Sequence, residues 1–250
     1  MKYTYQKGLV VPYAQKYSKQ LTVAVAAMFV ATFAATTLHV GAASVPVNGC
    51  TFLQTGSKWK LVANCTSIAQ INVPSGTRLD GNDKTIKAGF DFTDNSNNAV
   101  LGIIDASNVR VKDLTVDGNG RIKLHGINVY QSTNVKLDEV TTKNNTKNGL
   151  VVNGSDVMVK DLTTSGNAWG GVDVDQGGGV TMPSILTIKG KSRHAEMVHV
   201  YVDDMTKLVQ VNDVRNQYTF VNPAGGPLFD RLYTLKPVLD SHHDDDDHDD

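Results

Sequence analysis

The feature that most constrains this chain is an apolar repeat in its middle. Each copy starts with an apolar residue and has two more, two and five positions later. The copies start 26, 22, 23 and 29 residues apart. They are Val109/Val111/Leu114, Val135/Leu137/Val140, Val157/Val159/Leu162, Val180/Met182/Ile185 and Val209/Val211/Val214. Such a period is typical of solenoids, in which each copy buries its apolar face only by stacking on its neighbours.

Short alternating segments precede the later copies. They predict inward-facing pairs Ile127/Val129, Leu150/Val152, Val172/Val174 and Val198/Val200 within residues 126–130, 149–153, 171–175 and 197–201. β-Branched residues separated by Gly, Asn, Asp and Ser favour strands over helices. We therefore expect an all-β solenoid of about six coils whose equivalent strands pair in parallel. A β-sandwich is the alternative, but its shorter strand spacing does not explain the period.

Polar residues also recur within the repeat. Three copies have Asn ten positions after their first residue, at Asn119, Asn145 and Asn167. Asn tolerates the left-handed backbone that sharp corners require, and its amide can hydrogen-bond to an equivalent amide in the next coil. The sequence therefore predicts that these three side chains stack at one turn.

The segments NVRVKDLTVDGN (108–119) and NVKLDEVTTKNN (134–145) resemble the right-handed parallel β-helix, or pectin-lyase-like, superfamily. The resemblance covers residues 71–220 and is specific for the fold, not for an activity. That superfamily includes pectate and alginate lyases, polygalacturonases, uronate epimerases, phage tailspikes and non-catalytic surface proteins. The resemblance implies a substrate groove on one strand face, where some of the lyases use Ca²⁺.

The ends of the chain differ from the repeat. Residues 1–20 contain four lysines and no acid, and residues 21–43 form an uncharged apolar run that ends in small residues. This pattern predicts that residues 1–43 are a signal peptide or an N-terminal membrane anchor, and that the remainder is secreted or at the cell surface. We expect residues 44–70 to be an N-terminal cap, 71–220 the β-helix, and 221–250 a C-terminal cap, which includes Pro223, Pro227, Phe229 and Leu232, followed by a disordered His/Asp tail.

Charge and cysteine content narrow the partners and the compartment. The formal net charge is −1, and six of the 25 acids lie in the last ten residues. This balance, with no long Lys/Arg run, argues against a nucleic-acid binder, and a membrane is a partner only through residues 21–43 if they stay uncleaved. The two cysteines, Cys50 and Cys65, predict a disulfide across a short loop in an oxidising compartment.

The candidate site follows from the outward positions of the alternating segments. In register, these positions predict two columns, Asn128–Val151–Asp173–His199 and Tyr130–Asn153–Asp175–Tyr201. Carboxylates, an imidazole and a phenol suit proton transfer, so the catalytic candidates are Asp173, Asp175, His199 and Tyr201. Asp173 and Asp175 could hold Ca²⁺; the sequence requires no other cofactor. The predicted substrate contacts are Asn128, Tyr130, Asn153 and Trp169.

These observations support three interpretations of function. The first is an exported β-helix that contacts an extracellular, acidic polysaccharide and acts in binding or adhesion. The second is a polyuronate lyase or epimerase that abstracts a proton in the β-helix groove. The third is a purely structural surface solenoid. The position of His199 separates the first two, because catalysis by the predicted set requires His199 on the same groove floor as Asp173 and Asp175.

Overall fold

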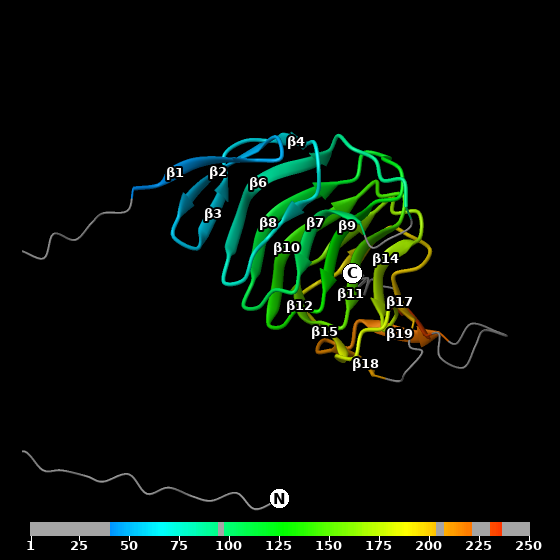
Figure 1. Cartoon of the computed structure of the whole chain (residues 1–250). Coiled ribbons are helices and arrows are strands. Elements are labelled where there is room, and N and C mark those ends of the chain that lie inside the picture. The colour runs from blue at the N-terminus through cyan, green and yellow to red at the C-terminus, as the bar shows by residue number, and fades with distance from the viewer. Residues whose placement is uncertain (1–40, 95–97, 204–207, 222–230, 237–250) are drawn as a thin grey trace, which may run out of the picture. The chain divides into compact units, whose positions relative to one another are not determined.

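The structure is a computed structural model that describes residues 41–94, 98–203, 208–221 and 231–236 (Figure 1). The chain divides into two compact units, 1–39 and 40–250. The predicted signal or anchor lies almost wholly outside the described residues, as does the His/Asp tail. No helix in the described part of the chain is long and apolar enough to cross a membrane.

The second unit is built from two sheets. The larger sheet contains β1 (Ala43–Val47), β2 (Cys50–Thr55), β3 (Lys58–Leu61), β4 (Cys65–Ser67), β6 (Arg78–Ala88), β8 (Arg110–Asp117), β10 (Val135–Lys143), β12 (Asp156–Lys160), β13 (Thr163–Ser165), β15 (Ser184–Lys189), β16 (Arg193–His194) and β18 (Val209–Asp213). The smaller sheet contains β5 (Ile71–Asn72), β7 (Ala99–Ile104), β9 (His125–Tyr130), β11 (Asn148–Asn153), β14 (Gly170–Asp175), β17 (Val200–Asp203), β19 (Tyr218–Val221) and β20 (Arg231–Leu235). We call them the large and the small sheet.

The strands stack in parallel from coil to coil, which confirms the predicted solenoid. The large sheet runs β3-β6-β8-β10-β12-β15-β18 and the small sheet β5-β7-β9-β11-β14-β17, all in parallel pairs. Figure 1 shows these strands side by side in chain order. The solenoid completes about five turns, one fewer than predicted, and the short strands β3–β5 extend it at the N-terminal end.

One residue per turn bends the strands of the large sheet into two flanks. Asp113, Glu139 and Asp161 sit at this bend with φ of 51°, 53° and 54°. Asp is several-fold enriched in this left-handed conformation, because its short polar side chain can hydrogen-bond to the nearby backbone. An acid four positions after the start of each of three copies therefore occupies this bend. Asn also adopts the left-handed backbone, as predicted for Asn119, and does so at Asn108, Asn134 and Asn144 as well.

The inward residues of the first three copies pair as predicted. Leu137 lies opposite Val111 and Val159, and Val140 lies opposite Leu114. The fourth and fifth copies were wrong. Val157 and Val159 pair with Leu186 and Ile188, not with Val180 and Met182. Leu186 pairs in turn with Val211, so the fifth copy starts two residues later than Val209. Residues 176–183 form an inserted turn instead, and this insertion moves the true repeat six positions along the chain.

A polar ladder runs inside the apolar core. The Asn145 Nδ2 donates to Asn167 Oδ1 at 2.6 Å, and Asn167 Nδ2 donates to Glu196 Oε1 at 2.5 Å. Asn145 and Asn167 are 2% and 4% exposed, so the ladder replaces water for these amides. Asn119 does not join it, because its Nδ2 donates to the Ala88 carbonyl and Gly118 lies against Asn145. The predicted stack is thus correct for two of its three members.

Caps cover the ends of the solenoid. At the N-terminal end, β1, β2 and β3 form antiparallel pairs, and the predicted disulfide joins Cys50 of β2 to Cys65 of β4. At the C-terminal end, β20 pairs antiparallel with β17 and β19 and so covers the edge of the small sheet. Of the predicted C-terminal cap residues, Pro223, Pro227 and Phe229 lie outside the described residues, and the backbone of Leu232 pairs with Tyr201.

The ladder should be a measurable source of stability. Asn167→Ala removes its central member and leaves the buried amide of Asn145 and the Glu196 carboxylate without their partner. We expect a loss of about 1–3 kcal/mol in the free energy of unfolding, measured by urea denaturation. Asn72→Ala, at an exposed strand position, is the matched control and should change it far less. Equal effects of the two substitutions would contradict a stabilising ladder.

Candidate functional site

The outer face of the small sheet brings most of the predicted site residues into register. Asn128, Val151 and Asp173 lie opposite one another on β9, β11 and β14, and so do Tyr130, Asn153 and Asp175. The next strand differs from the prediction: Tyr201 lies opposite Asp173, and Asp203 lies opposite Asp175. The predicted positions of His199 and Tyr201 were therefore wrong by two residues.

His199 lies in the C-terminal cap, not on the groove floor. It precedes β17, stacks on His194 with ring centroids 5.3 Å apart, and its Nδ1 accepts from the Leu235 backbone N–H at 2.8 Å. Burial lowers the pKa of His199, and burial together with His199 lowers the pKa of His194 to about 3. The His194 Nε2 is also 2.7 Å from the Tyr218 hydroxyl. His199 thus acts as a neutral acceptor in the cap, and the predicted four-residue catalytic set is not assembled.

Three carboxylates gather on this face of the small sheet. The Asn148 Nδ2 donates to Asp173 Oδ2 at 2.9 Å, and the Asn153 Nδ2 donates to Asp175 Oδ2 at 3.1 Å. The Oδ1 atoms of Asp173 and Asp175 are buried without a hydrogen-bond donor among the described residues. The pKa of Asp173 is raised to about 7, mainly by burial and further by the negative charges of Asp175 and Asp203. Asp173 can therefore hold or release a proton near neutral pH.

An exposed indole lies at the start of the strand that carries Asp173 and Asp175. Trp169, just before β14, is 58% exposed. The Lys147 Nζ lies 5.2 Å from its ring centroid, and the His125 ring meets it edge-on at 6.0 Å. His125 is held in turn, because its Nδ1 accepts from the Asn148 N–H at 3.2 Å. These contacts fix the orientation of the Trp169 ring and leave much of its surface open to a ligand.

The remaining predicted contacts differ in their access to solvent. Tyr130 is partly exposed at the end of β9, so it can reach a ligand. Asn128 and Asn153 are 2% and 0% exposed, so these side chains support the face from within and do not contact a ligand directly. The sequence analysis missed His125, Lys147 and Asn148, which connect Trp169 to Asp173. These residues lie at the starts of successive strands, and this shared position in the sequence could have identified them.

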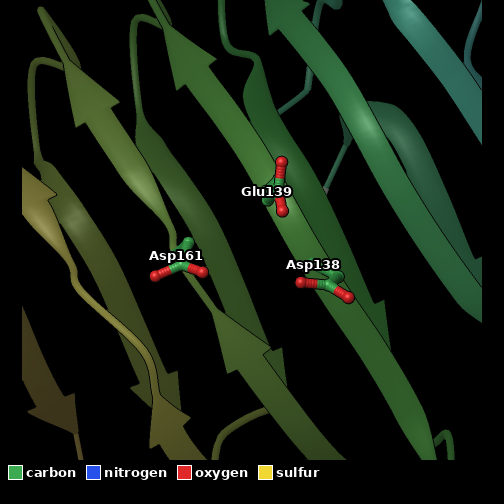
Figure 2. A group of neighbouring side chains, drawn as sticks. All are labelled: Asp138, Glu139 and Asp161. Atoms are coloured by element: carbon green, nitrogen blue, oxygen red, sulfur yellow. The ribbon is translucent and has the colours of Figure 1, made fainter.

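A second acidic group lies on the large sheet, at Asp138 and Glu139 of β10 and Asp161 after β12 (Figure 2). One carboxylate oxygen from each lies within 4.8 Å of the others. However, the Lys160 Nζ lies 3.3 Å from Asp138 and 3.6 Å from Asp161, and Arg110 binds Asp138 at 2.7 Å. These two cations pair with two of the three carboxylates, so the group is part of a network of ion pairs. No comparable three-ligand group occurs around Asp173 and Asp175 in the described residues, and the predicted Ca²⁺ site stays a prediction.

The raised pKa of Asp173 predicts a pH dependence of stability. The lowered pKa values of His125 and His194 make stability rise with pH below about 6.5. The folded state also holds a proton on Asp173 that the unfolded chain releases near pH 3.8, so Asp173 adds an opposite slope, which lowers stability from about pH 4 to about pH 7 and then levels off. Asp173→Asn mimics the protonated form. We expect this variant to lose that slope and to be more stable than the wild type at pH 8, in urea denaturation at several pH values. Parallel pH profiles of the two proteins would contradict the raised pKa.

Comparisons with known proteins agree with this fold. Residues 98–193 match a family model described as a right-handed β-helix region. One similar solved structure is ORF18 of Geobacillus virus E2, with 16% identity and a TM-score of 0.44; the match covers 62% of this chain and 31% of that one. No curated protein matches the sequence. The matched region and the observed parallel solenoid together place this chain in the right-handed parallel β-helix superfamily.

Proposed function

We propose that this β-helix binds an extracellular polysaccharide and acts in binding or adhesion, with the outer face of the small sheet as its sugar-binding site. The observation that carries this proposal is the exposed indole of Trp169, held in place by Lys147 and His125. The apolar face of a sugar ring packs well on an indole, and an indole fixed before binding loses little entropy when a ligand arrives.

The polar surroundings of Trp169 suit a ligand rich in hydroxyl groups. Asp173, Asp175 and Tyr201 are each partly exposed on adjoining strands, and carboxylates accept hydrogen bonds from hydroxyls. The same carboxylates repel anions, so this face favours a sugar unit that carries no charge next to them. The disulfide between Cys50 and Cys65 is consistent with an oxidising, extracellular setting.

Binding is favoured over catalysis because the predicted catalytic set is not assembled. His199 is turned into the cap, where it accepts a backbone hydrogen bond. Asp173 has a pKa suited to proton transfer, but His199, its predicted imidazole partner, lies against β20 and not on this face. A polyuronate lyase or epimerase therefore stays the alternative, and the experiment below separates it from binding.

Trp169→Ala tests the site directly. We expect about a tenfold or larger loss of affinity for the polysaccharide that the wild type retains best, measured by affinity electrophoresis through gels containing neutral and acidic polysaccharides. Ile122→Ala is the matched control, because Ile122 is also 58% exposed and apolar. A loss of the same size in both variants, or no loss in Trp169→Ala, would overturn this assignment.

The same polysaccharides test the catalytic alternative. If the protein only binds, incubation should release no reducing ends, form no unsaturated uronate and leave the ratio of uronate epimers unchanged, with or without Ca²⁺. A product formed by the wild type and lost in Asp173→Asn, but retained in the exposed control Asp156→Asn, would show an enzyme that uses Asp173. That result would replace the binding proposal.

A further inference from the structure

The part of the large sheet that precedes the bend at Asp113 and Glu139 carries a row of cations. Lys58, Arg78, Arg110 and Lys136 lie opposite one another on β3, β6, β8 and β10. All four side chains are exposed. Because adjacent strands are about 4.8 Å apart, the row spans about 14 Å along the solenoid axis. The row ends at Met158, which follows Lys136 on β12.

Most of this charge is not neutralised by the protein. Arg110 binds Asp138 at 2.7 Å, whereas Lys58, Arg78 and Lys136 have no acidic partner within 4.0 Å among the described residues. A second row lies two positions further along the strands, and its acids form ion pairs within that row. Asp80 pairs with Lys112 at 3.2 Å, and Asp138 pairs with Lys160 at 3.3 Å. This second row is Lys60, Asp80, Lys112, Asp138, Lys160 and Lys189.

Such a row is unfavourable for the free protein. Like charges repel one another, and like charges directly opposite one another on neighbouring strands destabilise a sheet. The second row avoids this cost near the N-terminal end by alternating Lys with Asp, and the first row does not. A bound anion opposite Lys58, Arg78 and Lys136 would remove the repulsion, so these three unpaired cations point to a ligand.

The surface between the rows is hollowed. One hollow of about 410 Å³ is lined by residues of both rows, including Lys58, Arg78 and Arg110. A second, of about 370 Å³, is lined by Arg78, Arg110, Lys136 and the intervening Asn108 and Asn134. The two hollows share Arg78 and Arg110 in their linings, so they adjoin along the row.

We propose that this cationic row binds a linear anionic polysaccharide laid along the solenoid axis, with one anionic group opposite each of the four cations. The register supplies equally spaced charges, which matches a polymer that repeats one anionic group per sugar unit. Neither row contains an aromatic side chain. Trp59, between them, contacts Phe52, is partly exposed and lines the first hollow, so this face offers one aromatic ring and not a series of rings. Single-stranded nucleic acids are gripped largely by stacking on aromatic rings, so a polysaccharide fits this face better. This site is separate from the sugar-binding face of the small sheet.

The test uses the full chain and oligogalacturonates from the dimer to the octamer, with binding measured by calorimetry at several salt concentrations. We expect affinity to rise up to the tetramer and then level off. The double variant Arg78→Gln/Lys136→Gln should bind about tenfold or more weakly and with a shallower salt dependence. Lys87→Gln/Lys191→Gln removes two exposed cations beyond the bend and should bind as the wild type does. Trp169→Ala should also leave this binding unchanged, which separates the site from that on the small sheet.

Several results would overturn the proposal. Equal binding of fully methyl-esterified oligomers would show that charge is not recognised, and equal losses in the two double variants would show that the row is not the site. A single-stranded oligonucleotide that binds more tightly than the tetramer would show a nucleic-acid surface instead. Affinity that is independent of oligomer length would exclude a row of four equivalent contacts.

Discussion

The structure depends on one constraint, the parallel register of each coil on the next. In parallel stacking, every position of one strand repeats directly above the same position of its neighbour. The inner face then becomes columns of aliphatic side chains, such as Val111, Leu137 and Val159, all at most 1% exposed. The same register makes columns of the outward residues, so any charge or ring that recurs there forms a line along the solenoid.

The corners and the interior show how the chain meets the polar requirements of this packing. A bend of one residue at Asp113, Glu139 and Asp161 needs a left-handed backbone in every turn. Inside, the amides of Asn145 and Asn167 satisfy one another, and at the C-terminal end Glu196 and His194 replace Asn and Thr in the same columns. Thr164 bonds to both of these end groups, at 2.6 Å and 2.7 Å. The ladder therefore ends on groups that the cap strand covers.

The sequence predicted those parts of the fold in which the repeat is regular. The all-β solenoid, the inward residues of three copies and the disulfide follow from periodicity and spacing alone. The inserted turn at 176–183 could not be placed, because Val180 and Met182 imitate the apolar pattern while the pairing strand begins at Ser184. The error at β17 has a different cause. A shift of two residues keeps inward and outward positions unchanged, so Val198/Val200 and Val200/Val202 satisfy the alternation equally well. Only pairing with β14 distinguishes them, and this pairing moves His199 out of the site.

The two outer faces explain why bulk composition was uninformative about partners. The formal net charge of −1 hides a carboxylate group around Asp173 on the small sheet and a cation row from Lys58 to Lys136 on the large sheet. Because the register repeats each position at a fixed spacing, a charge placed once per coil accumulates on one face without changing the overall balance. Under the two proposals above, an anionic chain binds the large sheet and a neutral sugar unit binds the indole of Trp169 on the small sheet. A solenoid of this kind can present two chemically distinct surfaces because its core uses only the inward half of each strand.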